Sequence, residues 1–320
     1  MMKLHIVMYH YVRDLVNSRY PQIKGLDLNL FEKQIAFLQE NFTFVCAEDL
    51  LEARLGGKIL PENAIFLTFD DGYIDHYTNV FPLLKEKKIP AFFSMPGKIL
   101  KEGKLLDVNK IHFILASAEK GALRESLFSL MNYYRGTEYT FPKNEVLYNE
   151  YAMEGRFDDK DTAFIKKMLQ FVLPETLRNK IVDALFREYI SLSENAFSKE
   201  LYMSIEQVRL MKSEGMHFGI HGYDHYWLGE MNKEEMIHDV ERALDVFDDV
   251  LDRKEWIMCY PYGSYSKETL DFLATTNCAI GLTTKVAVAK ISEDNWLTLP
   301  RLDTNDYPPK SEKYKKMILT

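Results

Sequence analysis

The stretch Ala64-Ile65-Phe66-Leu67-Thr68-Phe69-Asp70-Asp71-Gly72-Tyr73 decides the fold class of this 320-residue chain. Its apolar run, Ala64 to Phe69, is typical of a strand in a parallel sheet and ends in two carboxylates and a glycine. At the carboxyl end of such a strand, a turn can bring both carboxylates into the mouth where barrel active sites lie. One carboxylate could bind a metal ion while the other takes up a proton; for this motif alone, an Asp-Asp-Gly surface turn is the alternative.

Similar apolar runs recur along the chain and alternate with amphipathic segments, the pattern of βα units around a parallel sheet. Asn29 is the expected N-cap of one intervening helix, and Ser204 and Asn232 are the expected caps of two later ones. Besides residues 64–69, strands are expected at residues 4–8, 42–46, 91–95, 217–221, 256–260, 279–283 and 296–299. This alternation predicts an α/β fold, an irregular (β/α) barrel.

Residues 101–200 break the alternation. Apolar residues recur there at helical spacing over residues 111–134 and 164–190, and no strand pattern is present. The chain also has no fixed-period repeat and no Gly/Ser linker. We therefore expect a single domain over residues 1–320, with residues 101–200 as a helical insertion docked on the barrel.

The composition argues against several classes of protein. Lys and Arg number 40 against 48 Asp and Glu, so the net charge of -8 gives no attraction for nucleic acid. Cys46, Cys259 and Cys278 lack C-x-x-C spacing, which argues against a disulfide framework or a thiolate zinc site. The N-terminus lacks a signal-peptide pattern, and no run approaches the roughly 20 apolar residues of a membrane span. A cytoplasmic location is expected, and the oligomeric state stays open.

A second group of polar residues follows another apolar run. In His221-Gly222-Tyr223-Asp224-His225 the two imidazoles can meet on one face if the chain turns helically after His221. Alone, a structural pair of histidines is the simpler interpretation. One Asp with two His, however, makes a three-ligand metal site that leaves positions open for water and substrate, and such a site favours amide or ester hydrolysis. Zinc is the expected metal, with cobalt, nickel or iron as alternatives.

With these motifs the sequence resembles the polysaccharide deacetylases with the NodB homology domain, carbohydrate esterase family 4. Residues 68–73 are similar to the family's Thr-Phe-Asp-Asp-Gly-Tyr signature, and residues 221–225 to its His-x-x-x-His motif. The resemblance covers the chain on either side of the insertion, as far as about residue 305. It implies that Asp70 is the catalytic base and that Asp71 binds the metal together with His221 and His225.

The family's third motif, Arg-x-Pro-Tyr-Gly, is matched only in part by Cys259-Tyr260-Pro261-Tyr262-Gly263. The resemblance implies that the backbone N–H of Tyr262 stabilises the oxyanion, because this donor depends on the chain path and not on the side chain. The family's arginine, which orients the base, is replaced by Cys259. Arg301 is the candidate substitute, and an ordinary surface arginine is the alternative.

The family's late Leu-x-His motif is absent. Instead, Met8-Tyr9-His10-Tyr11 resembles the Met-Tyr-His motif of the subfamily that includes the deacetylases of poly-N-acetylglucosamine export. His10 is therefore the candidate general acid, with a core histidine as the alternative. Tyr73 and Trp227 are candidate stacking partners for a sugar ring, although aromatic residues are also ordinary core material.

The function that this combination implies is metal-dependent removal of an acetyl group, above all N-acetyl, from a sugar in surface-glycan or polysaccharide metabolism. The substrate is then a polysaccharide, a lipid-linked glycan or a nucleotide sugar. Two alternatives remain: an amide hydrolase acting on a non-sugar substrate, and a catalytically idle sugar-binding or assembly protein. Retention of Asp70 beside the ligand set argues against the idle protein, since binding alone needs no base.

Overall fold

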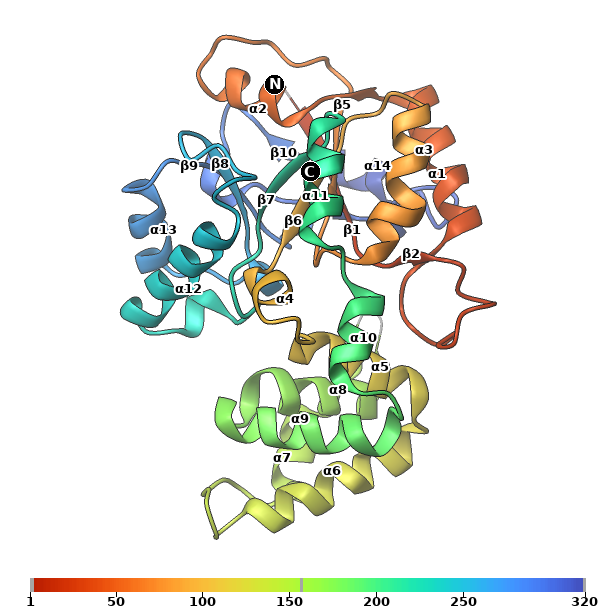
Figure 1. Cartoon of the computed structure of the whole chain (residues 1–320), viewed down its shortest axis with the longest axis vertical. Helices are drawn as coiled ribbons and strands as arrows, with labels where there is room; N and C mark the ends of the chain where they lie inside the picture. Colours follow the sequence, from red (N-terminus) through yellow and green to blue (C-terminus); the bar gives the residue numbers. More distant parts are fainter. Residues whose placement is uncertain (1–2, 156–157, 319–320) are drawn as a thin grey trace. The chain divides into compact units, whose positions relative to one another are not determined.

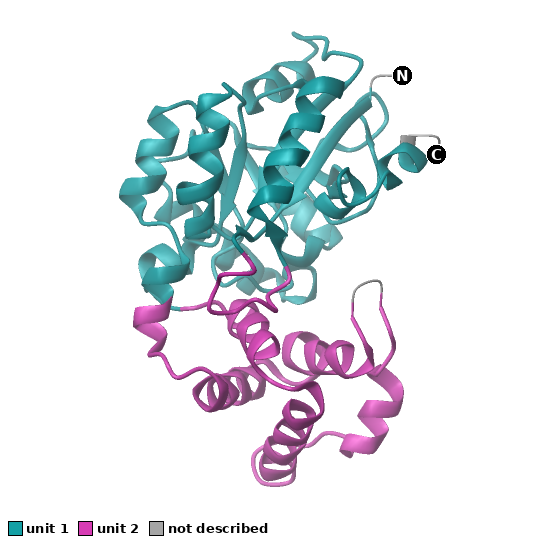
Figure 2. Cartoon of the chain, turned by 90° about the vertical axis from the view of Figure 1, so that its right-hand side faces the viewer, with its two compact units in different colours: residues 1–14, 25–104, 198–320 teal, residues 15–24, 105–197 magenta. Residues whose placement is uncertain are grey.

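The computed structural model of this chain describes residues 3–155 and 158–318, which divide into two compact units. Unit 1 comprises the described parts of residues 1–14, 25–104 and 198–320, and unit 2 comprises those of residues 15–24 and 105–197 (Figure 2). No helix within the described residues is both long and apolar enough to cross a membrane.

Unit 1 is built on a nine-stranded sheet with the strand order β10-β1-β5-β6-β7-β8-β9, in which β4 also pairs with β5 and β11 with β1 (Figure 1). Every pairing in it is parallel except that of β1 with β10. The strands are β1 (Lys3–Tyr9), β4 (Thr43–Phe44), β5 (Ala64–Phe69), β6 (Phe92–Met95), β7 (His217–Ile220), β8 (Trp256–Cys259), β9 (Cys278–Leu282), β10 (Ala289–Lys290) and β11 (Leu302–Asp303), with β2 (Val12–Arg13) and β3 (Leu26–Asp27) forming a separate pair.

The sheet curls into a half-barrel, and a short segment spans from its β9 edge to β1. Leu299 bridges Leu282 of β9, and Leu302 of β11 pairs in parallel with Val7 of β1. The prediction of an irregular α/β barrel is thereby confirmed. The prediction of a strand at residues 296–299 was wrong, because residues 296–298 form a 3-10 helix. The Asn295 side chain accepts a hydrogen bond from the Leu297 N–H and caps this helical turn.

Helices and turns of helix connect these strands. Ser204 and Asn232 cap α11 and α12 as predicted, whereas α1 is capped by Asp27 and not by Asn29. The α-helices of unit 1 are α1 (Leu28–Asn41), α2 (Ala47–Arg54), α3 (Phe81–Glu86), α4 (Gly97–Lys101), α11 (Ile205–Ser213), α12 (Lys233–Val246), α13 (Lys267–Ala274) and α14 (Lys313–Ile318). The shorter turns are η1 (His76–Val80, a π-helix) and the 3-10 helices η3 (Leu228–Glu230), η4 (Pro261–Gly263), η5 (Trp296–Thr298) and η6 (Thr304–Asp306).

Strand β5 lies at the centre of the core, since all six of its residues are buried. On one face, Phe66 belongs to a buried hydrophobic cluster that also contains Leu4, Ile257 and Ile280. On the other, Phe69 stacks on Tyr9 with a ring distance of 4.8 Å. Burial of each such side chain contributes roughly 1.5–3 kcal/mol. The strand that ends in the two aspartates is therefore held rigidly from both sides.

Unit 2 is helical and buries its own apolar residues, among them Leu127 of α6 and Ile181 of α9. The two long helices expected at residues 111–134 and 164–190 are interrupted, because Glu119 starts a new helix and Pro174 cannot continue the preceding one. The helices are α5 (Asp107–Ser117), α6 (Lys120–Tyr134), α7 (Asn144–Tyr151), α8 (Lys160–Lys167), the π-helix η2 (Met168–Val172), α9 (Glu175–Tyr189) and α10 (Glu194–Leu201), which crosses the boundary between the units at residue 198.

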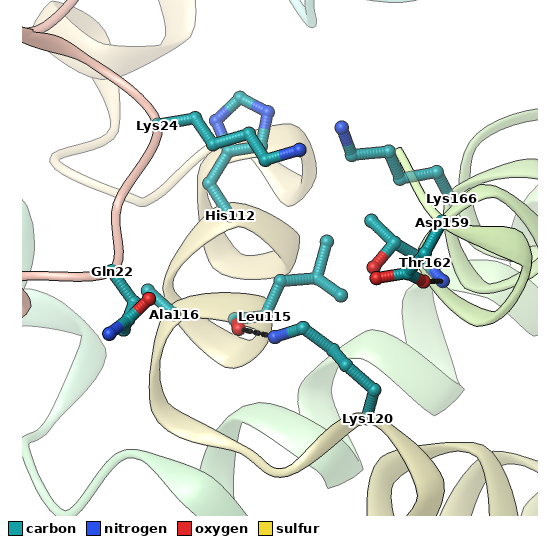
Figure 3. A pocket seen from close by; sticks show the side chains of 9 residues that line it. All are labelled: Gln22, Lys24, His112, Leu115, Ala116, Lys120, Asp159, Thr162 and Lys166. Atoms are coloured by element: carbon teal, nitrogen blue, oxygen red, sulfur yellow. Dashed lines mark hydrogen bonds between the residues drawn. The ribbon is translucent and has the colours of Figure 1, made fainter. Parts of the chain in front are cut away.

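Residues 15–24 belong to unit 2, which the sequence analysis did not anticipate. Lys24 Nζ lies 2.7 Å from Asp158 Oδ1, and the Tyr20 ring packs edge-on against Phe113. Lys24 also lines a cavity of about 160 Å³ inside this unit, together with Lys120 and Lys166 (Figure 3). Asp158 pairs with Lys166 as well, so one carboxylate holds residues 15–24 against the helices.

Candidate active site

Asp70 and Asp71 follow the last residue of β5, where the chain turns sharply. The Asp70 N–H still donates to Tyr9 O at 2.9 Å, which continues the pairing with β1. Asp71 then takes φ 75° and Gly72 φ 68°. Both aspartates are buried, with 1% and 2% of their surfaces exposed. The turn thus places two adjacent carboxylates inside the half-barrel, where each has a different set of neighbours.

Asp70 is surrounded by hydrogen-bond donors from distant parts of the chain. Its Oδ1 accepts from Ser94 Oγ at 2.7 Å, from Cys259 Sγ at 3.3 Å and from Arg301 Nη1 at 3.0 Å. Arg301 Nη2 lies 2.8 Å from Oδ2. Arg301 is itself fixed, because its Nε donates to Thr283 O at 2.8 Å. The buried guanidinium is therefore aimed at Asp70, and the surface-arginine alternative does not hold.

The charge of Asp70 is set by two opposing effects. Burial raises the pKa of Asp70. The Arg301 guanidinium, with smaller contributions from His221 and His10, lowers it by more than burial raises it, so the pKa lies below its ordinary value. Asp70 is consequently ionised at neutral pH. Since its Oδ1 already accepts three hydrogen bonds, this carboxylate is better suited to accepting a proton than to binding a metal.

The loop after β7 carries the two histidines and is held by Asp239 of α12. The Asp239 carboxylate accepts the N–H groups of Tyr223 and Asp224, at 2.8 and 2.9 Å. Gly222 is required at this close approach, because a Cβ there would lie 2.9 Å from Asp239 Oδ1 and because its φ is 66°. The loop ends at His225, whose φ is 59°. This path returns the second imidazole to the first, with 4.8 Å between the ring centres.

His221 is oriented by a backbone carbonyl. Its Nδ1 lies 2.7 Å from Cys259 O, and since a carbonyl only accepts, Nδ1 carries the proton and Nε2 offers its lone pair. Burial lowers the pKa of His221 to about 4, so the ring is neutral at neutral pH. A neutral imidazole with a free Nε2 and a carbonyl at Nδ1 is the usual arrangement of a metal-binding histidine.

Asp71, His221 and His225 converge on one point, with Asp71 Oδ1 lying 3.5 Å from His221 Nε2 and 3.4 Å from His225 Nε2. Oxygen and nitrogen ligands held about 2.0–2.2 Å from one ion at tetrahedral angles would lie about 3.3–3.6 Å apart. The buried Asp71 Oδ1 has no hydrogen-bond donor among the described residues. These three side chains therefore fit a divalent metal ion, and they form one of the possible ligand groups in the described structure.

Tyr73 supports Asp71. It is fully buried, and its hydroxyl donates to Asp71 Oδ2 at 2.5 Å. The prediction that Tyr73 stacks on a sugar does not fit this burial; the side chain stacks instead on Tyr11, with 3.9 Å between ring centres. Oδ2 is thus occupied by the phenol, which leaves Oδ1 to face the imidazoles.

His10 follows β1 at the same end of the sheet and is half-buried. Tyr9, which precedes it, pairs with Phe69, which precedes Asp70 on the neighbouring strand. The backbone of His10 is held by His76, whose Nε2 lies 2.9 Å from His10 O. His10 and Asp70 thus follow the ends of two paired, parallel strands.

Tyr262 and Trp227 form an aromatic wall beside His225. Their rings stack with 4.5 Å between centres and 6° between planes, and the Tyr262 ring meets His225 edge-on at 4.8 Å. Tyr262 has φ 58°, so its backbone departs from the helical path within η4. Both aromatic side chains are partly exposed, which leaves ring surface open to a ligand.

Backbone strain is concentrated at this site. Among the described residues, the non-glycine residues with positive φ are Asp71, Lys88, His225 and Tyr262, and all but Lys88 are candidate site residues. Such conformations are uncommon for non-glycine residues and cost of the order of 1–3 kcal/mol each, so they persist only where the surroundings enforce them. This concentration is independent support for a functional site here.

Several contributing residues were not predicted from the sequence. Ser94 and Cys259 complete the donors around Asp70, Asp239 holds the histidine loop, and His76 fixes the backbone of His10. In the sequence, Cys259 was notable only because it stands where the family has an arginine. Since β5 and β8 are not neighbours in the sheet, no local pattern could reveal that its thiol reaches Asp70.

Comparisons with known proteins identify the family of this chain. The sequence matches the family described as Polysaccharide deacetylase over residues 57–112 and 157–280. Over 93 residues it is 39% identical to the poly-beta-1,6-N-acetyl-D-glucosamine N-deacetylase of Escherichia coli strain K12; the match covers 28% of this chain and 13% of that protein. The chain thus matches only a small part of that relative.

Solved structures are similar over nearly the whole length. The deacetylase PplD of Streptococcus pyogenes, in complex with acetate, aligns with a TM-score of 0.59 and 17% identity, covering 98% of this chain and 97% of that one. IcaB from Ammonifex degensii gives a TM-score of 0.58 and 18% identity, covering 98% and 96%. At these identities the likeness establishes a shared fold.

Proposed function

This chain belongs to the polysaccharide deacetylase family, and we propose that it hydrolyses an acetyl group, in particular an N-acetyl group, from a sugar. The observation that carries the proposal is the convergence of Asp71 with two imidazoles beside a separately held, ionised Asp70. A ligand set and a base are the two parts that hydrolysis of an acetamide requires.

We propose that Asp71, His221 and His225 hold a divalent metal ion, zinc in the first instance, with cobalt, nickel or iron also suited to this donor set. When bound, the ion supplies a Lewis acid that polarises the acetyl carbonyl and activates water. Tyr73 keeps Asp71 oriented through the bond to Oδ2. The neutral state of His221, which its burial favours, leaves Nε2 available for the ion.

The remaining roles fall to the chain's own acid, base and donors. Asp70 accepts a proton from the attacking water, and Arg301 keeps it ionised and oriented for that step. The backbone N–H of Tyr262 stabilises the oxyanion that forms at the acetyl oxygen. His10 protonates the departing amine. The buried ion pair of Asp70 with Arg301 supports the first role, and the position of Tyr262 beside His225 supports its role at the oxyanion.

We propose an N-acetylated sugar unit within a glycan as the substrate. The relative from Escherichia coli is named for poly-beta-1,6-N-acetyl-D-glucosamine, and the stacked rings of Trp227 and Tyr262 offer the apolar face on which a sugar ring packs. A lipid-linked glycan or a nucleotide sugar would present the same unit. We also propose that unit 2 is an insertion in the deacetylase domain.

The test is acetate release from poly-β-1,6-N-acetylglucosamine, N-acetylglucosamine oligomers and simple acetamides, with metal content measured on the same samples. Asp70→Asn should retain its metal while turnover falls roughly 10²–10⁴-fold, the usual contribution of a general base. Asp158→Asn, in unit 2, is a control that leaves the site residues intact. Release from acetamides but from none of the sugars would favour the non-sugar amide hydrolase, and no release from any substrate by the metal-loaded wild type would favour the idle binding protein.

A further inference from the structure

A second group of possible metal-binding side chains lies in unit 1, away from the catalytic residues. Cys46, Glu48 and His217 each offer one ligand atom, and these atoms all lie within 4.8 Å of one another. His217 is the first residue of β7, whereas His221 follows the last. At about 3.3 Å per residue, the two histidines are about 13 Å apart along the strand. The two groups therefore lie at opposite ends of β7.

The backbone fixes both segments that supply these side chains. Cys46 is the N-cap of α2, and its N–H donates to the Asp49 carboxylate at 2.8 Å. The His217 N–H donates to Ala91 O at 3.0 Å, in register with β6. An ion could therefore bind through side-chain rotations alone, without movement of the backbone. A site with its backbone preset loses little conformational entropy when it binds a metal.

The side chains already approach one another in pairs. His217 Nε2 lies 2.8 Å from Glu48 Oε2. The Cys46 thiol, at the start of the helix that carries Glu48, brings a sulfur atom within 4.8 Å of both of these atoms. One sulfur, one nitrogen and one oxygen donor make a set that suits zinc, which accepts all three.

A cavity of about 440 Å³ adjoins this group. Glu48 and His217 line it, together with apolar residues such as Met216 and Trp256. This cavity has room for a water molecule that would complete the tetrahedral coordination of an ion held by three protein ligands. The C-x-x-C spacing that thiolate zinc sites commonly show is absent from the sequence; here the fold itself brings one thiol to a distant histidine.

We propose that Cys46, Glu48 and His217 bind a zinc ion that links α2 to β7, separately from the catalytic site. When the bond from sulfur to zinc forms, the thiol releases its proton to solvent.

Cobalt(II) titration of the full chain tests this site, because cobalt gives a near-ultraviolet charge-transfer band only when a thiolate binds it. The catalytic set of Asp71, His221 and His225 contains no thiol. The band should therefore appear in the wild type and also in the double variant His221→Ala/His225→Ala. This outcome does not depend on the proposed deacetylase activity.

Three single cysteine variants locate the thiolate. Cys46→Ser should abolish the band while keeping α2 intact, since serine is a favourable N-cap. Cys259→Ser and Cys278→Ser are the matched controls and should keep the band. Glu48→Gln alters a largely exposed side chain and should shift the titration to higher cobalt concentrations. Absence of the band from the wild type, or its persistence in Cys46→Ser, overturns the proposal.

Discussion

The Arg301 guanidinium and the Asp70 carboxylate form a fully buried ion pair, with 2.8 Å between Nη2 and Oδ2, although 231 positions separate the two residues. Among the described residues no other cation lies as directly against this carboxylate, which Ser94 and Cys259 contact through neutral donors. The arginine therefore governs both the stability and the protonation of Asp70.

Removal of this arginine should affect stability and the pH profile together. Arg301→Ala leaves a buried carboxylate without its cation, which typically costs about 3–5 kcal/mol in the free energy of unfolding. It should lower turnover without releasing the metal. In the wild type the pKa of Asp70 is depressed, so its stabilising effect is present above the unfolded pKa of about 3.9 and is lost as the pH falls through the folded value.

In Arg301→Ala, the guanidinium no longer offsets the effect of burial, so the pKa of Asp70 rises. The acid limb of the pH–activity profile should therefore move to higher pH. Arg301→Lys should restore part of the shift. The control is Arg13→Ala, which breaks the partly buried pair with Asp75 and should destabilise unit 1 without moving the profile. An unchanged acid limb in both Arg301 variants would contradict the role given to this residue.

The three proposed metal ligands should each be essential. Asp71→Ala, His221→Ala and His225→Ala remove one of three protein ligands, and each should lose most of its metal and its turnover. Metal analysis of purified protein measures the first effect, with the exposed His238→Ala as the control. The occupancy of the site at Cys46 must be subtracted, for which Cys46→Ser serves as the background. Full occupancy in two of the three variants would rule out this ligand set.

Tyr73→Phe should weaken the metal site without removing a ligand. It deletes the hydroxyl that donates to Asp71 Oδ2, and loss of such a supporting bond typically costs 10–100-fold in metal affinity or activity. Competition with a chelator measures the affinity. Tyr9→Phe is the matched control, since it deletes a buried hydroxyl that donates to Gln34 instead. Equal affinities in the two variants would mean that the phenol does not support Asp71.

His10→Gln should reveal whether this residue is the general acid. Turnover of an N-acetyl sugar should fall roughly 10²–10⁴-fold with metal retained, because the departing amine needs a proton. An aryl acetate, whose leaving group departs as a phenolate, should be much less affected. The measurement is the ratio of the two rates in variant and wild type. A proportional loss on both substrates would assign His10 to positioning.

The strand ends could be predicted from the sequence because their signals are local. The apolar run of β5 and the spacing of His221 and His225 place chemistry-bearing residues after strands of a parallel sheet, and parallel strands bring such ends together. The caps Ser204 and Asn232 were predictable for the same reason.

What could not be predicted depends on tertiary packing. Ser94 and Cys259 approach Asp70 only once β6 and β8 take their places in the curled sheet. The 3-10 turn at residues 296–298 was mistaken for a strand because its apolar residues carry no periodicity that separates the two. The attachment of residues 15–24 to unit 2 involves long-range contacts, among them the ion pair of Lys24 with Asp158 and the packing of Tyr20 against Phe113.

The segment that spans from β9 to β1 also carries Arg301, and this has a consequence for biosynthesis. The ribosome delivers the ligand residues, the base and Cys259 before it delivers Arg301. Until the segment from Leu299 to Leu302 docks beside β1, the guanidinium that offsets the burial of Asp70 is not in place. Docking of this segment beside β1 and pairing of Asp70 with its guanidinium are therefore a single late event in folding.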